Sequence, residues 1–246
     1  MKKLFLFGIL IVPFIIWSCG ESPTKLSSND FIIKLVDSVT AEPLPDYTIK
    51  FFYLFNEQEF SGLINENFHL YPNPITDIAD VQILMYQKSK LVIQADNIIS
   101  KHNKIIKGPF DADPGNYQFK VNLNDDSLFN HGLFRLYSYV DDVIRDSVNL
   151  IRLQLVDLQD FMDNKTLLIE NLTTDLNGIV NLKIEFGIWI GEEFYRTINN
   201  GQAVGDINVS ENIGIKVCNK ENEIVKELVI PFDELKKGGT IIEINK

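Results

Sequence analysis

Alternation of apolar and polar residues is the feature of this sequence that most constrains its fold. In "NYQFKVNL", four apolar residues beginning at Tyr117 alternate with polar ones, and "VNLKIEF" repeats the pattern from Val180. Successive side chains of an extended strand point to opposite faces. Each segment therefore predicts a strand with one buried face and one solvent-exposed face.

Strand-like segments recur along the chain and are separated by Asn, Asp, Gly and Pro. Further strands are expected at residues 31–37, 47–55, 79–86, 90–95, 133–140, 150–157, 166–172, 223–230 and 240–244. The best helical candidate is a turn or two at 232–237, and the lack of crossover helices excludes a parallel α/β fold. We predict an all-β fold, with two Ig-like antiparallel β-sandwiches in tandem.

Size and charge narrow the classes of function. The chain has 246 residues, 45% of them apolar, enough for one large core or two of about 100 residues each. It carries 34 acidic and 23 basic side chains, and the net charge of −11 repels phosphate backbones. The one basic cluster, between Lys88 and Lys107, is offset by Asp96 and is expected to be solvated. We therefore expect no nucleic-acid partner.

The N-terminus has the layout of a secretory signal. Lys2 and Lys3 precede the uncharged, mostly apolar residues 4–17, and small residues follow at 18–20. As a helix, residues 4–17 would reach only about 21 Å, short of a hydrocarbon core of about 30 Å. "IWSCG" resembles a bacterial lipobox, which implies a signal peptide at 1–18 and lipidation of Cys19. Ordinary cleavage near the same place, giving a soluble secreted protein, is the alternative.

Lipidation would decide the location of the protein. Two or more acyl chains on Cys19 give stable membrane attachment, and the polar residues 19–30 suit a flexible tether. We expect a protein anchored in the cell envelope, in the outer membrane, facing either the periplasm or the surface. The other cysteine, Cys218, then has no intramolecular disulfide partner and is expected to be a half-buried, inert thiol.

"YPNP", at residues 71–74, leads into a strand and resembles the opening of a known Ig-like family. These small domains occur in flagellar hook-capping proteins and as C-terminal sorting domains of type IX secretion cargo. The resemblance continues through "SKLVIQADNI", "DPGNYQFKVNL" and "HGLFRLYSYV" and covers residues 66–141. Because residues 142–246 follow it, the resemblance implies an internal structural module, with an export role as the alternative.

Two shorter segments resemble carboxypeptidase-regulatory-like modules, another sandwich family of bacterial surfaces. They are "LVDSVTAEPLPDYTIKFF" (35–52) and "TTDLNGIVNLKI" (173–184). One domain interrupted by the other is an arrangement that this resemblance leaves open. The predicted organisation has N-terminal strands at 31–65 that pack with either sandwich, an Ig-like domain at 66–141 and a C-terminal sandwich at 142–246.

Common motifs for catalysis are missing from the sequence. The sequence has no His-Glu-x-x-His, no Gly-x-Ser-x-Gly and no phosphate-binding loop, so we predict no catalytic residue, no metal and no cofactor. Asp175 and Asn177 begin a pattern like a calcium loop, but its closing ligands are absent. Asn177-Gly178 therefore predicts a hairpin turn.

"WIGEEFYR", at residues 189–196, is the best candidate for contact with a ligand. Trp189 and Tyr195 could stack on sugar rings, and Glu192 and Glu193 could accept hydrogen bonds from hydroxyl groups. A glycosidase would need two opposed carboxyl groups about 5 to 10 Å apart. Adjacent strand residues point to opposite faces, so these two glutamates are not expected to form that pair.

The function expected from the sequence is that of a non-catalytic, lipid-anchored envelope protein. It would act as a β-sandwich structural or interaction module, with envelope proteins or glycans as partners. One alternative is a glycan-binding or glycan-degrading protein that uses Glu192 or Glu193. Another is a factor in secretion or assembly that uses the module at 66–141.

Overall fold

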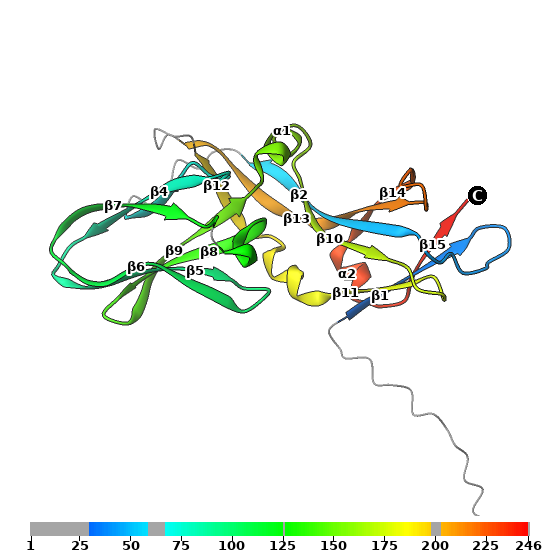
Figure 1. The fold of residues 1–246 in the computed structure, drawn as a ribbon, viewed down its shortest axis with the longest axis horizontal. Helices are drawn as coiled ribbons and strands as arrows, with labels where there is room; N and C mark the ends of the chain where they lie inside the picture. Colours follow the sequence, from blue (N-terminus) through cyan, green and yellow to red (C-terminus); the bar gives the residue numbers. More distant parts are fainter. Residues whose placement is uncertain (1–29, 59–66, 125, 198–202, 246) are drawn as a thin grey trace, which may run out of the picture.

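The computed structural model describes residues 30–245 except 59–66, 125 and 198–202. The predicted signal peptide and Cys19 therefore lie outside the described residues. The described chain is mostly β-strand, and the predicted all-β sandwich fold is confirmed. Figure 1 shows two sandwiches arranged along the long axis of the molecule.

The first sandwich takes its strands from both ends of the described chain, and we call it the split sandwich. Its strands are β1 (Asp30–Asp37), β2 (Thr48–Gln58), β10 (Thr166–Thr173), β11 (Ile179–Lys183), β12 (Glu193–Thr197), β13 (Ala203–Cys218), β14 (Ile224–Pro231) and β15 (Thr240–Ile244). One sheet has the order β11-β1-β15, and the other has the order β10-β2-β13-β12 with β14 also paired to β13. The pairing of β1 with β15 is parallel, a local exception to the predicted antiparallel pattern.

The second sandwich is inserted between β2 and β10, and we call it the inserted sandwich. Its strands are β3 (Phe68–Tyr71), β4 (Ile78–Met85), β5 (Ser89–Asn97), β6 (His102–Ala112), β7 (Gly115–Asn122), β8 (Gly132–Val140) and β9 (Val143–Arg152). They form sheets of order β3-β4-β7 and β6-β5-β8-β9. Seven antiparallel strands divided between two sheets in this way are typical of Ig-like sandwiches.

The sandwiches are thus nested and not in tandem, and the arrangement that the sequence left open, one domain interrupted by the other, is the one that the strand pairing gives. β2 pairs with both β10 and β13, which ties residues 48–58 to the C-terminal part of the chain. β9 pairs with β8 along its whole length, so the boundary expected after residue 141 falls between two paired strands. The segments 35–52 and 173–184 lie together in the split sandwich, because β1 pairs with β11 and β2 with β10.

Gly178 shows why a glycine is needed where these two segments meet. Its φ is +71°, and an added Cβ would lie 2.5 Å from the carbonyl oxygen of Leu35 and 2.9 Å from the amide nitrogen of Leu44. The backbone amide of Leu35 also donates a hydrogen bond to the carbonyl of Gly178, at 2.8 Å. Only glycine meets both the backbone angle and the close approach.

Short helices complete the fold: η1 (Ser127–Phe129), α1 (Leu155–Asn164), η2 (Ile184–Trp189) and α2 (Phe232–Leu235). The predicted turn or two at 232–237 is confirmed by α2. The strand expected at 150–157 ends at Arg152, and α1 begins at Leu155. α1 has Phe161 as its one buried side chain among the described residues, and its apolar residues Leu155, Leu158 and Met162 follow the i, i+3, i+7 spacing of an amphipathic helix.

Each sandwich has its own apolar core. Val81, Leu91 and Leu136 belong to the core of the inserted sandwich, and the core of the split sandwich contains Phe51 and Trp189. Some side chains of the inserted sandwich are exceptions, and the half-buried Ile98 is one that packs against the core of the split sandwich. Leu133 of β8 and Ile151 of β9 pack in the core of the split sandwich. The two sandwiches therefore share apolar packing where β9 meets β12 and β8 meets β10.

Candidate functional site

A pocket of about 400 Å³ lies where the two sandwiches meet, and we call it the junction pocket. The inserted sandwich contributes Arg135, Ser147, Val148 and Asn149, and the split sandwich contributes Gly191, Glu192, Glu193 and Tyr195. Three of the four ligand-contacting residues predicted from "WIGEEFYR" thus line a single pocket. The sequence did not indicate that residues of β8 and β9 would form its other wall.

Arg135 is at the centre of the polar contacts of the junction pocket. Its Nε donates to Oδ1 of Asn149 at 2.7 Å, and one terminal nitrogen donates to Oε2 of Glu192 at 2.6 Å. Asn149 Nδ2 donates to the same Glu192 oxygen at 3.1 Å and to the carbonyl oxygen of Glu193 at 2.8 Å. Glu192 is therefore engaged in a charge-assisted network that connects the sandwiches.

Trp189 lies beneath this network and cannot contact a ligand in the pocket. It has no solvent-exposed surface, and it packs on Phe194 with ring centroids 5.8 Å apart. The guanidinium carbon of Arg135 lies 5.3 Å from the Trp189 ring centroid, within the range of a cation–π contact. The indole supports Arg135 from below, which is a structural role that the sequence did not predict.

Glu193 and Tyr195 are the predicted residues that remain available. Glu193 is exposed, and its carboxylate makes no hydrogen bond or ion pair within the described chain. Tyr195 is half-buried, and its hydroxyl also has no hydrogen-bond partner there. Burial raises the pKa of Tyr195, and the nearby carboxylates of Asp206 and Glu193 raise it further, so its hydroxyl stays protonated.

Asn73, from "YPNP", fastens the inserted sandwich to the split one. Its side chain is 2% exposed, and Nδ2 donates to the carbonyl oxygens of Asn149 at 3.1 Å and Tyr195 at 2.8 Å. Its Oδ1 accepts a hydrogen bond from the amide of Ile151 at 2.9 Å. Since Tyr195 belongs to β12 and the other two residues to β9, one buried amide connects both sandwiches.

The backbone after "YPNP" continues this attachment. The amide of Ile75 donates to the carbonyl of Ile151 at 2.7 Å, and the amide of Leu153 donates to the carbonyl of Ile75 at 2.9 Å. The tetrapeptide thus serves as the joint between the sandwiches, in addition to opening the inserted one. Its two prolines follow cis peptide bonds at Tyr71-Pro72 and Asn73-Pro74.

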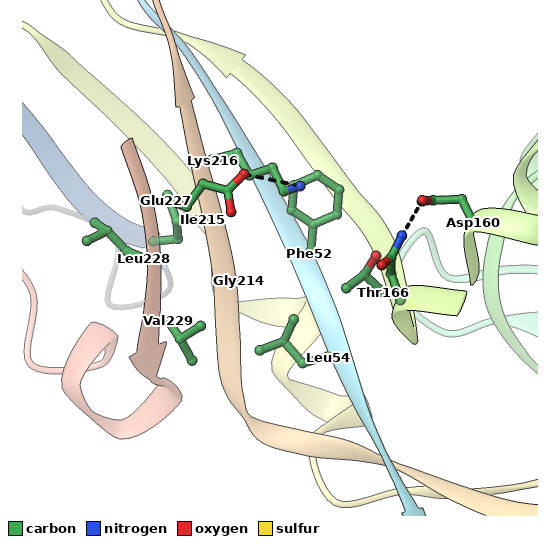
Figure 2. Close-up of a pocket in the computed structure, with 11 residues that line it drawn as sticks. Phe52, Leu54, Asp160, Thr166, Gly214, Ile215, Lys216, Glu227, Leu228 and Val229 are labelled. Atoms are coloured by element: carbon green, nitrogen blue, oxygen red, sulfur yellow. Dashed lines mark hydrogen bonds and ion pairs between the residues drawn. The ribbon is translucent and has the colours of Figure 1, made fainter. Parts of the chain in front are cut away.

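A second pocket, of about 410 Å³, lies on the outer face of the sheet formed by β10, β2, β13 and β14. Figure 2 shows Leu54 and Val229 on either side of Gly214, which forms its floor. Lys216 and Glu227 form an ion pair of 3.4 Å, and Lys216 Nζ lies 5.5 Å from the centroid of the Phe52 ring. The lysine therefore covers the aromatic ring that a ligand would otherwise stack upon.

Cys218 and Asp175 have structural roles in the fold. Cys218 is fully buried, deeper than the half-buried position predicted. Asp175 Oδ1 accepts hydrogen bonds from the amides of Asn177 at 2.9 Å and Ile179 at 2.8 Å, as expected for a hairpin turn. Within the described residues, no cluster of three or more His, Cys, Asp or Glu side chains could hold a metal ion. No helix in that part of the chain is long and apolar enough to cross a membrane.

Comparison of the chain with protein-family models, curated proteins and solved structures finds no match. The resemblances of residues 66–141, 35–52 and 173–184 therefore stay predictions.

Proposed function

We propose that the protein is a non-catalytic, lipid-anchored cell-envelope protein that acts as a rigid, two-sandwich interaction module. The observation that carries this proposal is the junction itself. Trp189 and Glu192, two of the side chains best suited to chemistry, are used to hold the sandwiches together. A carboxylate bound by Arg135 and Asn149 is poorly placed to serve as a general acid or a nucleophile.

Rigidity follows from the way the sandwiches are joined. Domains in one chain move relative to each other by default unless their interface is large and apolar. Here Leu133 and Ile151 pack in the core of the neighbouring sandwich, and two chain crossings lead into and out of the inserted sandwich. Asn73 adds three hydrogen bonds in a site from which water is excluded. A fixed orientation would present one continuous surface to a partner.

The envelope location is supported by the N-terminal sequence pattern. Residues 1–18 have the order of a signal peptide, and Cys19 follows at the position that a lipobox requires. A net charge of −11 disfavours nucleic acid and anionic headgroups as partners. Envelope proteins and glycans are the partner classes that fit, and the membrane would be reached through the lipid.

The anchor is tested by replacing Cys19 with Ser. Metabolic labelling with a palmitate analogue should mark the parent protein and not the C19S variant. The variant should also be lost from the membrane fraction. Equal labelling, or unchanged membrane retention of the C19S variant, would refute the lipid anchor. Cys218 provides an internal control because it is buried and should not take up label.

A further inference from the structure

We propose that the outer face of the β6-β5-β8-β9 sheet, together with the junction pocket, binds a neutral polysaccharide. The proposal rests on the proposed function as an interaction module and names the class of its ligand. The surface was not indicated by "WIGEEFYR", because most of its residues come from β8, β5 and β9.

β8 presents two tyrosines side by side on this face. Leu136 and Ser138 are fully buried, and the alternation of the strand places Tyr137 and Tyr139 on the opposite side. Both tyrosines are half-buried, and their ring centroids lie 6.2 Å apart with the planes tilted by 54°. Arg135 follows on the same face and reaches the junction pocket. The tyrosines therefore form an aromatic platform that leads to the pocket.

Strand pairing makes the platform continuous with the pocket. Tyr137 lies opposite Ser147, and Arg135 lies opposite Asn149. Ser147 and Asn149 both line the pocket, and side chains directly opposite on antiparallel strands have Cβ atoms about 5 Å apart. Tyr137 thus borders the pocket, and Tyr139 extends the platform away from it.

Polar groups flank the platform on its other side. Gln94 of β5 lies opposite Tyr137, and its amide donates to Asp96 Oδ1 at 2.7 Å. Val92 lies opposite Tyr139 and adds apolar surface. The face therefore combines flat aromatic rings with planar amide and carboxylate groups at their edges.

This combination matches the chemistry of a sugar chain. The electron-rich face of an aromatic ring attracts the C–H groups on one side of a pyranose, and amides, carboxylates and hydroxyls bond its hydroxyl groups. In the described chain, the hydroxyls of Tyr137, Tyr139 and Ser147 make no hydrogen bond. With the hydroxyl of Tyr195 and the carboxylate of Glu193, they form a row of free polar groups along the surface.

The charges around the pocket favour binding of a neutral glycan over an acidic one. Among the described residues, Arg135 is the one cation that lines the pocket, and it is already paired with Glu192 and stacked on Trp189. Glu193 adds an uncompensated negative charge in a chain of net charge −11. A polysaccharide with carboxylate or sulfate groups would be repelled. A protein partner would require a larger apolar centre than this polar pocket offers.

The test is affinity electrophoresis of the full chain, purified in detergent, through gels that contain one soluble polysaccharide each. The neutral probes are amylopectin, hydroxyethylcellulose, xylan, galactomannan and laminarin, and polygalacturonate is the acidic comparison. At least one neutral probe should retard the protein, and calorimetry with its hexasaccharide should give a dissociation constant of about 1 mM or tighter.

Matched variants locate the binding. Tyr137→Ala and Tyr139→Ala should each weaken binding by about tenfold, and Tyr137→Phe should retain most of it because the ring is kept. Tyr86→Ala is the control, since Tyr86 is another tyrosine of the inserted sandwich, with 64% exposure, but lies outside the platform. Thermal unfolding of each variant shows whether the fold is intact.

Three results would overturn the proposal: no retardation by any neutral probe, retardation by polygalacturonate alone, or binding that both alanine variants leave unchanged. Binding of polylysine in place of the glycans, lost in the alanine variants, would identify a cationic partner and also overturn it. None of these results bears on acylation of Cys19, so failure of the glycan proposal is distinct from failure of the envelope anchor.

Discussion

Asn73→Ala tests how strongly the joint couples the two sandwiches. The substitution removes one acceptor and two donor hydrogen bonds from a side chain that is 2% exposed. The amide of Ile151 and the carbonyls of Asn149 and Tyr195 lose these partners. A buried polar group without a partner costs about 1–3 kcal/mol, and water entering the gap would satisfy part of the set. We expect the free energy of unfolding to fall by about 2–4 kcal/mol.

The protein provides its own probe for this measurement. Trp17 lies in the predicted signal peptide, so Trp189 is the single tryptophan of the chain from Cys19 onward. It is buried against Arg135 at the junction. Urea unfolding followed by tryptophan fluorescence therefore reports directly on the coupled region.

Two control variants sharpen the result. Asn73→Asp keeps the shape and one acceptor but replaces the donor by a carboxylate facing two carbonyl oxygens, so it should be at least as destabilising as alanine. Asn103→Ala, at an exposed position of β6, should change the free energy of unfolding by no more than about 0.5 kcal/mol. An Asn73→Ala effect as small as that of Asn103→Ala would refute the role assigned to the joint.

Three further predictions concern other parts of the molecule. Gly178→Ala should lower the free energy of unfolding by more than about 2 kcal/mol because the added Cβ would clash with Leu35 and Leu44. Gly238 is the control, since its φ of +73° is similar but no atom lies within 4 Å of an added Cβ. Urea unfolding of Gly238→Ala should show a cost nearer 1 kcal/mol, about that of the backbone angle alone. Burial lowers the pKa of His131 from its ordinary value of 6.5, an effect that Asp157 opposes. The contribution of His131 to stability is therefore complete above pH 6.5 and is lost as the pH falls through the lowered pKa. His131→Gln should flatten the dependence of the urea midpoint on pH in that range, and an unchanged slope would contradict the lowered pKa. The Cys218 thiol should not react with Ellman's reagent in the native protein and should react fully in urea, because the side chain has no exposed surface; rapid reaction of the folded protein would be inconsistent with this burial.

Local patterns in the sequence predicted most of the strands, since period-two alternation depends only on neighbouring residues, but they did not predict β3, β6 or β12. The strand expected at 133–140 corresponds to β8, and that at 79–86 to β4. The helix α1 was missed because the alternation of β9 continues through Leu153 and Leu155, beyond the end of the strand at Arg152. Its residues, beginning at Leu155, read as the end of the preceding strand.

Contacts between distant strands could not be predicted in the same way. Nothing near residue 135 indicates that Arg135 will meet Glu192, because this contact depends on how the two sandwiches dock. Docking of the sandwiches also determines whether Trp189 is buried or exposed, because its sequence context fits a ligand site as well as a core. Asn73 was visible only as part of a turn between prolines, and its three partners lie 76, 78 and 122 residues further along the chain.

The distance between two spin labels, one on each sandwich, shows whether the two sandwiches form one rigid unit. Labels are attached at Asn103→Cys in the inserted sandwich and Lys237→Cys in the split sandwich, two exposed positions, with Cys19 replaced by Ser and Cys218 protected by burial. Pulsed electron resonance should give a single narrow distance distribution that broadens in the Asn73→Ala variant. A broad distribution in the parent protein would show that the sandwiches move independently and would contradict the account.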